Sequence, residues 1–96
     1  MKIALFVHGF VQGVGYRHFV KKNADAIGVN GIVRNLEDGS VLVIADGDAG
    51  TLAAFEKSIS VSTEYGVRVM HIDRISEGNP EFPKEKYDGN KFSISK

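Results

Sequence analysis

The segment 11–17 holds the residues whose types and spacing are best suited to chemistry. It reads Val-Gln-Gly-Val-Gly-Tyr-Arg, so two glycines precede a helical pattern and Arg17 falls in the first turn of that pattern. Glycine permits backbone conformations in which successive N–H groups point inward, and a helix N-terminus adds partial positive charge. A guanidinium adds a planar set of donors that matches phosphate oxygens. Two interpretations fit these residues: an anion-binding loop, or a tight strand-to-helix turn beside a solvated arginine.

Asn35 is the second candidate, and it lies on the same face of a predicted strand (29–36) as Val33. In a right-handed β-α-β unit, the end of this strand comes close to the loop that follows the first strand. We therefore expect Asn35 to approach residues 13–17. Its carboxamide offers donors and an acceptor, which can hold a water molecule in line with a bound phosphorus. The competing interpretation is a turn-forming side chain just before a hairpin.

Other polar residues suit structural roles better. Arg34 points away from Asn35 by strand parity, so we expect it in a solvated surface position. His8, His18 and His71 lack the spacing of metal ligands, and the sequence predicts neither a metal site nor a cofactor. The chain has no cysteine, which excludes disulfides and thiolate chemistry.

The elements that must position these residues follow from hydrophobic periodicity, which alternates in strands and recurs every three or four residues in helices. An Asp-Gly pair at 38–39 predicts a hairpin turn, and a long polar loop is predicted over 77–90. Strands are predicted at 2–8, 29–36, 40–46, 67–75 and 92–95, and helices at 16–27 and 48–59.

The element order βαββαβ with a short terminal strand predicts a ferredoxin-like sandwich of the α+β class. Two helices in so small a protein cannot each cover a sheet of their own. The simplest packing places both on one face of a single four-stranded, mostly antiparallel sheet. A length of 96 residues predicts one domain spanning residues 1–96. This fold hosts many functions, so it does not decide the activity.

The charge balance limits the partners. Twelve basic and twelve acidic side chains cancel, which argues against a partner bound by bulk electrostatics, such as nucleic acid or an anionic membrane. The apolar run at the N-terminus is too short for a secretory signal or a membrane span. We therefore expect a cytoplasmic protein, which the lack of cysteine suits, and a monomer.

The sequence contains two glycine-rich blocks, Gly9-x-Val11-Gln12-Gly13-Val14-Gly15-Tyr16-Arg17 and Gly31-x-Val33-Arg34-Asn35-x-x-Asp38-Gly39. Together they closely resemble the acylphosphatase family. The similarity covers about residues 3–59. Gly15 stands where many members carry a bulky aromatic residue, although glycine there resembles some microbial members, and the segment 60–66 lacks the usual turn of the family. The resemblance implies the ferredoxin-like fold and metal-independent hydrolysis of small-molecule acyl phosphates to a carboxylate and inorganic phosphate.

The same resemblance implies roles for individual residues. It makes Arg17 and Asn35 the catalytic residues, with Arg17 on the phosphate and Asn35 orienting the attacking water. A carboxylate leaves as a weak base, so the reaction needs no general acid, and positioning and charge stabilisation suffice. The resemblance assigns further phosphate binding to the backbone N–H groups of Gln12, Gly13, Val14, Gly15 and Tyr16.

Two other classes of function fit parts of the sequence. A non-catalytic module that binds a phosphate-bearing metabolite would need the loop and Arg17, but it would not need Asn35. An RNA-binding ferredoxin-like domain would need an aromatic pair on a central strand and basic surroundings. The zero net charge and the lack of such a pair argue against it.

Overall fold

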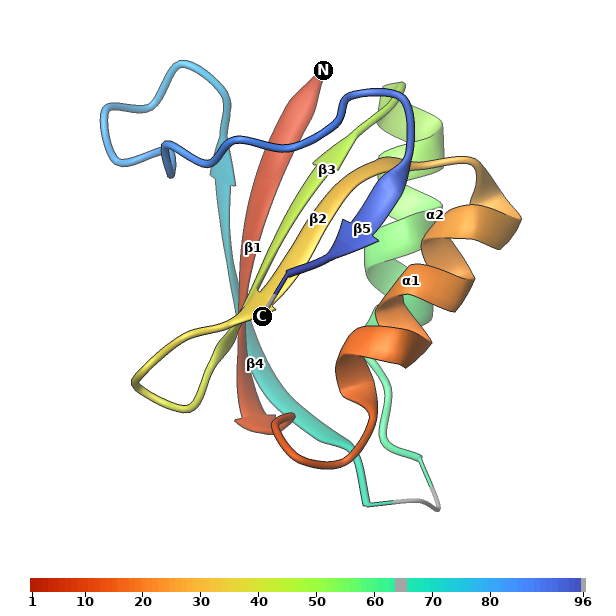
Figure 1. Ribbon diagram of the computed structural model, residues 1–96, viewed down its shortest axis with the longest axis vertical. Coiled ribbons are helices and arrows are strands. Elements are labelled where there is room, and N and C mark those ends of the chain that lie inside the picture. The colour runs from red at the N-terminus through yellow and green to blue at the C-terminus, as the bar shows by residue number, and fades with distance from the viewer. Residues whose placement is uncertain (64–65, 96) are drawn as a thin grey trace.

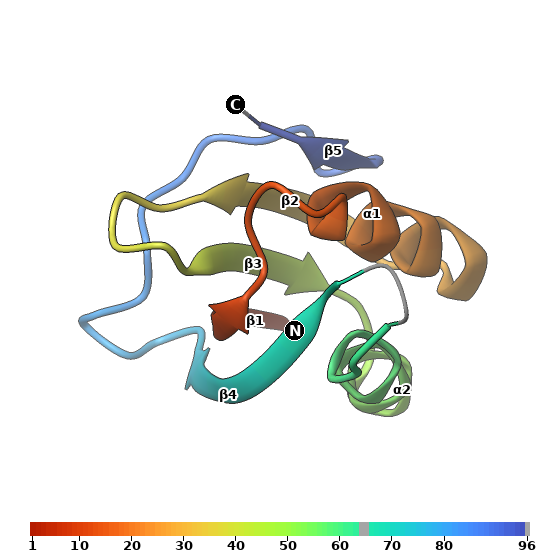
Figure 2. The same ribbon diagram turned by 90° about the horizontal axis from the view of Figure 1, so that it is seen from below.

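The computed structural model contains one five-stranded sheet with two helices on one of its faces (Figure 1, Figure 2). It describes residues 1–63 and 66–95. The observed order confirms the predicted βαββαβ arrangement with a short last strand. The elements are β1 (Lys2–Phe10), α1 (Tyr16–Ile27), β2 (Asn30–Asn35), β3 (Val41–Asp46), α2 (Ala49–Ile59), β4 (Arg68–Ser76) and β5 (Phe92–Ile94).

The sheet has the strand order β4-β1-β3-β2-β5. The pairs β1–β3, β1–β4 and β2–β3 are antiparallel, whereas β5 runs parallel to β2. The mostly antiparallel sheet was predicted, but the terminal strand extends it from four strands to five. β5 thereby lies beside the strand that carries Asn35 (Figure 1).

The main core lies between the sheet and the two helices. Alternate residues of β1 face it, as predicted, and helical spacing directs one stripe of each helix into it. Burying each large apolar side chain contributes roughly 1.5–3 kcal/mol. Members of this core from β1, α1 and α2 are Ile3, Leu5, Val7, Tyr16, Val20, Ala24, Leu52, Phe55 and Ile59.

The opposite face of the sheet has a smaller apolar cluster, formed by Ala4, Ile32, Leu42 and Ile44. Phe82 and Tyr87 pack against it, so the connection predicted as a polar loop supplies two aromatic side chains to this face. In this connection Glu85 Oε1 lies 2.6 Å from Arg34 Nε. Arg34 therefore points away from Asn35 as expected, but its predicted solvated role is wrong because it is half-buried in an ion pair.

The helix ends follow the predicted local chemistry. Asp48 Oδ1 accepts a hydrogen bond of 2.8 Å from the backbone N–H of Thr51, which caps α2. Gly28 ends α1 in the left-handed conformation, which glycine adopts without steric cost. β1 runs two residues beyond its predicted end because Gly9 and Phe10 continue to pair with β4.

Candidate active site

A short loop, residues 11–15, joins β1 to α1 and is fixed at both ends. Val11 and Tyr16 are each only 1% exposed and belong to the core between the sheet and the helices. The Tyr16 hydroxyl also donates a 2.8 Å hydrogen bond to the backbone carbonyl of Ile59 at the end of α2. The backbone between these two anchors therefore has a defined position at the start of α1.

Two glycines give this loop its shape. Gly13 has a φ of 74° and Gly15 a φ of 78°, and no residue other than glycine has a positive φ within 1–63 and 66–95. Left-handed residues in such a turn bring successive N–H groups into a concave, anion-binding arrangement. Gly15 also serves as the N-cap of α1 and has no side chain to cap it. Among the described residues, no hydrogen bond uses the backbone N–H groups of residues 12–16.

Arg17 extends from the first turn of α1 toward the edge of the sheet. Its Nη1 donates a 2.9 Å hydrogen bond to the backbone carbonyl of Ser95, whose own N–H bonds to the carbonyl of Val33 at 2.9 Å. This chain of contacts places the guanidinium next to β2. A guanidinium has five N–H donors, so this single bond leaves donors for an anion.

Asn35 is the last residue of β2 and faces the helices. It pairs directly with Val41, which belongs to the helix-side core, and it shares a face with Val33. Its Oδ1 is buried and has no hydrogen-bond partner in the described part of the chain. Leaving such an atom unpaired costs about 1–3 kcal/mol, so this oxygen is suited to accept from a water molecule or a ligand.

The hairpin turn after β2 depends on a different side chain. Asp38 Oδ1 accepts a 2.9 Å bond from the Ser40 N–H and also accepts from the Ser40 hydroxyl. These bonds hold the pKa of Asp38 below its ordinary value, the hydroxyl bond most. The turn-forming role considered for Asn35 thus belongs to Asp38, and the Asn35 oxygen takes no part in it.

Gln12 joins the loop to this hairpin. Its Nε2 donates hydrogen bonds of 2.7 Å to the Leu36 carbonyl and 2.8 Å to the Ser40 carbonyl. One end of the loop is therefore attached just beyond Asn35, while Arg17 at the other end is attached through Ser95 to Val33. The structure brings the loop, Arg17 and Asn35 to the same end of β2.

Sequence reasoning missed the two attachments that assemble this site. In both, a side chain donates to a backbone carbonyl of a distant segment: Gln12 to Leu36, and Arg17 to Ser95. A carbonyl is present at every residue, so no residue type marks it as an acceptor. The segment 60–66, where the sequence departs from the family pattern, includes residues 64 and 65, which lie outside the described residues.

The structure brings together two histidines that are far apart in the sequence. His8 and His71 stack across β1 and β4 with ring centroids 5.8 Å apart. Their Nε2 atoms lie 3.2 and 2.6 Å from the carboxylate of Asp73, and these hydrogen bonds, led by the one from His71, lower the pKa of Asp73. No group of three His, Cys, Asp or Glu side chains within 1–63 and 66–95 is placed to hold a metal ion.

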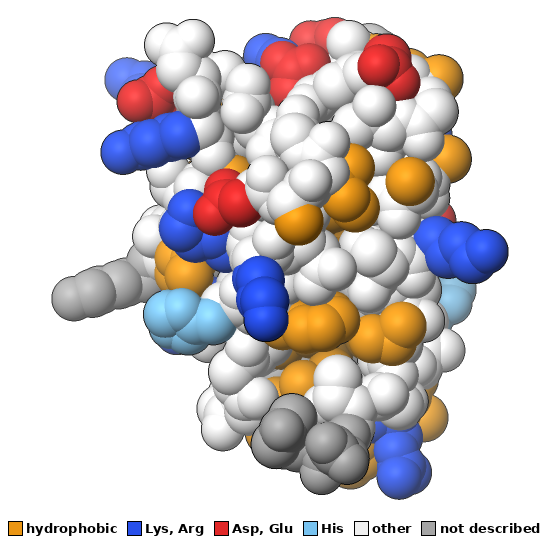
Figure 3. All heavy atoms as spheres, turned by 90° about the vertical axis from the view of Figure 1, so that its right-hand side faces the viewer, with side chains coloured by type: hydrophobic (Ala, Val, Ile, Leu, Met, Phe, Trp, Pro, Cys, Tyr) orange, Lys and Arg blue, Asp and Glu red, His pale blue; other side chains and the backbone are white. Residues whose placement is uncertain are grey.

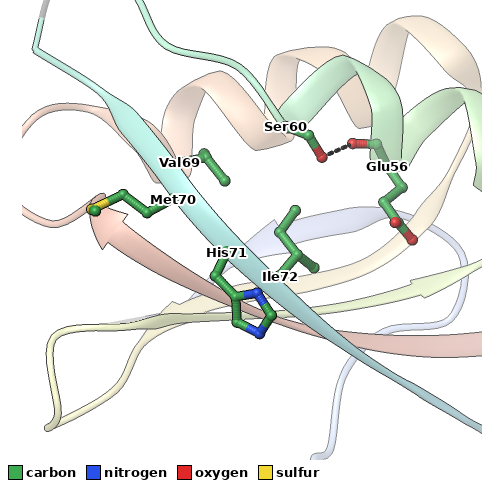
Figure 4. Close-up of a pocket in the computed structure, with 6 residues that line it drawn as sticks. All are labelled: Glu56, Ser60, Val69, Met70, His71 and Ile72. Carbon is green, nitrogen blue, oxygen red and sulfur yellow. Dashed lines mark hydrogen bonds between the residues drawn. The ribbon is translucent and has the colours of Figure 1, made fainter.

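A separate hollow of about 380 Å³ lies between α2 and β4 (Figure 4). It contains none of the predicted site residues. Glu56 is one of its lining residues, and Glu56 Oε1 lies 3.6 Å from Arg74 Nη1. Its lining residues are Glu56, Ser60, Val69, Met70, His71 and Ile72.

The charged side chains on the helix side of the molecule are of both signs and are interspersed (Figure 3). This face agrees with the zero net charge and lacks the one-sign surface typical of nucleic-acid binding. In the part of the chain that the structure describes, no helix has the length and apolar character needed to cross a membrane.

Comparison with known proteins places these features in a family. The model of the acylphosphatase family matches residues 3–94, which include every helix and strand of the described residues except Lys2, the first residue of β1. The chain belongs to the acylphosphatase family. The match extends the resemblance at residues 3–59 through β4 and β5. An acylphosphatase of Mannheimia succiniciproducens is 40% identical over 79 residues, covering 82% of this chain and 83% of that protein.

Other acylphosphatases agree over a greater length. That of Ligilactobacillus salivarius is 40% identical over 91 residues, covering 95% of this chain and 93% of its own. The crystal structure of acylphosphatase from Bacillus subtilis superposes with a TM-score of 0.81 at 29% identity, covering 99% of this chain and 98% of that one. An acylphosphatase structure from Coxiella burnetii gives 0.77 at 26% identity, with 98% and 90% coverage. Sequence and fold therefore agree on an acylphosphatase enzyme with a ferredoxin-like fold.

Proposed function

We propose that this acylphosphatase hydrolyses its substrate without a metal ion, using Arg17 and the loop amides for phosphate and Asn35 for water. One observation carries the proposal: Asn35 Oδ1, which is buried and has no hydrogen-bond partner among the described residues, lies at the end of β2, between the two places where the loop is attached. Family membership supports the class of reaction. The arrangement supports the residue roles, because Asn35 Oδ1 is an acceptor suited to water and the loop amides and Arg17 are donors suited to phosphate.

Phosphate binding is assigned to fixed donors. The N–H groups of residues 12–16 and the start of α1 surround one side of the phosphate, and the guanidinium of Arg17 completes the set. Charge spreads over the equatorial phosphate oxygens in the transition state. Donors already held in place by Val11 and Tyr16 can stabilise that charge without reorganising.

The water molecule is assigned to Asn35. Its Oδ1 accepts an O–H bond from the water and thereby directs an oxygen lone pair at phosphorus. The new bond forms between the water oxygen and phosphorus as the bond between phosphorus and the acyl oxygen breaks. The acyl oxygen leaves with the electron pair as a carboxylate, and the water proton passes to a phosphate oxygen. No general acid is required because a carboxylate is a weak base.

We also propose that the protein works as a single-domain cytoplasmic monomer with a small-molecule substrate. The cysteine-free composition and balanced charge support this proposal. Light scattering of the purified chain tests the oligomeric state, and a dimer mass at micromolar concentration would contradict it.

Following hydrolysis of an acyl phosphate, such as benzoyl phosphate, by ultraviolet absorbance tests the activity. We expect the chain to accelerate hydrolysis equally with and without a chelator. Phosphate binding without hydrolysis would favour a non-catalytic binding module. Loss of activity in the chelator would show that a metal ion is required.

A further inference from the structure

Gln12 directs its side chain away from the place assigned to phosphate. A carboxamide has two N–H donors, and Gln12 Nε2 donates to two acceptors, the carbonyls of Leu36 and Ser40. No N–H of this side chain is left for a phosphate oxygen. Its remaining polar atom is an acceptor oxygen, which cannot donate to an anion. The side chain of Gln12 therefore binds the hairpin, and this role is independent of any ligand of the Gln12 backbone N–H.

The two acceptors are the carbonyls that close the hairpin. The Ser40 carbonyl also accepts from the Leu36 N–H at 2.9 Å, and the Leu36 carbonyl accepts from the Gly39 N–H at 3.2 Å. Gln12 thus supplies a second donor to each carbonyl and cross-links the hairpin to the loop. Ser40 is only 2% exposed, so water does not readily replace the donor at this residue.

We propose that Gln12 is a positioning residue for the hydrolysis, and this inference rests on the proposed function. Its carboxamide fixes the phosphate-binding loop against the residue that follows Asn35. The phosphorus bound by the loop and the water held by Asn35 therefore keep a fixed relative position. In-line attack requires reacting atoms about 3–3.5 Å apart, and a misplacement of about 1 Å can cost roughly 100-fold in rate.

The first test is Gln12→Met, which keeps the length and volume of the side chain and removes both donors. We expect kcat to fall roughly 10- to 100-fold. The inhibition constant of inorganic phosphate should rise less than about threefold, because Arg17 and the loop amides remain. Gln12→Asn keeps the donors but is one methylene shorter, so it should also lose turnover. If one variant does not fold, as judged by circular dichroism, the other decides.

Asn30 provides the matched control. Its Nδ2 donates a 3.0 Å bond to the Gly89 carbonyl, which is also a contact from a side chain to a distant backbone carbonyl. Asn30→Met should lower stability without changing kcat. A merely structural role for Gln12 predicts instead that its variants behave like Asn30→Met, with a lower Tm and unchanged kcat.

A double-mutant cycle with Asn35→Ala shows whether Gln12 acts through Asn35. Without the Asn35 carboxamide there is no oriented water to align, so adding Gln12→Met should change kcat less than about twofold. Full additivity of the two losses would overturn the inference. Wild-type kcat in Gln12→Met would overturn it while leaving the proposed function intact. Absence of hydrolysis by the unmodified chain would overturn the proposed function, and the inference with it.

Discussion

Arg17 reaches the site from α1 and Asn35 from β2, and the two side chains share no hydrogen bond. Their chemistry also differs, because a guanidinium donates to anions whereas the free Asn35 Oδ1 accepts. The proposed binding of phosphate by Arg17 and the proposed orientation of water by Asn35 should therefore be separable by substitution.

Replacing these two residues should give different kinetic results. Arg17→Ala should weaken inhibition by inorganic phosphate and lower turnover together. Asn35→Ala should lower kcat by roughly 100- to 1,000-fold, about 3–4 kcal/mol, and keep most of the phosphate affinity. Steady-state kinetics with phosphate as a competitive inhibitor measures both quantities. Arg34→Ala is the matched control for Arg17, because Arg34 lies on the opposite face and its loss should leave kcat unchanged.

Strand parity was enough to predict that Asn35 and Arg34 lie on opposite faces of β2, where they pair with Val41 and Leu42. Residue type suggested Arg17 as an anion-binding candidate, and this role stays a prediction. Neither could predict that Gln12 bonds to the hairpin or that the Ser95 carbonyl binds Arg17, since these contacts depend on the approach of backbones that are remote in sequence. Residue types and strand parity therefore predict which chemical groups are present, but not the contacts that align these groups.

At the scale of elements, Gly31 controls how closely β2 approaches β3. Its φ is 147°, and a Cβ built on it would lie 1.8 Å from the carbonyl oxygen of Ile44. Gly31→Ala should destabilise the protein by about 3 kcal/mol, since the backbone of the central sheet must move. Urea denaturation measures the change. Gly89→Ala is the control, because its Cβ would meet nothing within 4 Å, and an equal effect of the two would contradict this account.

Periodicity predicted both helices and all five strands to within a few residues. It could not predict the partner of β5, because three paired residues contain too little pattern to specify an edge of the sheet. It also missed the packing of Phe82 and Tyr87, since isolated aromatics in a polar segment form no repeating pattern. The features that periodicity missed, the pairing of β5 and the packing of Phe82 and Tyr87, depend only on long-range contacts.

At the scale of the whole molecule, three exposed carboxylates link folding to acid pH. Hydrogen bonds lower the pKa of Asp38, Asp48 and Asp73, from Ser40, Thr51 and His71 respectively as the largest causes. Their stabilisation is complete above the unfolded pKa of about 3.9 and is lost as the pH falls through the lower folded values. The Tm should therefore decrease as the pH is lowered below about 4.

Calorimetry between pH 6 and 2 measures this decrease. Asp38→Asn keeps an acceptor for Ser40 and removes one titrating group, so its Tm should depend less on pH in this range. A Tm that stays constant or rises down to pH 2 would contradict the contribution of these carboxylates.

The anchor of the loop at Tyr16 has an optical consequence. The chain has three tyrosines and no tryptophan, and burial raises the pKa of the Tyr16 phenol. In an alkaline titration followed by phenolate absorbance, Tyr16 should ionise later than an ordinary phenol, and Tyr16→Phe should remove this delayed step. Above about pH 10 the unfolded chain ionises more readily, so the free energy of unfolding falls as pH rises. Inorganic phosphate, which we propose binds the folded loop, should delay the absorbance step further when it is added.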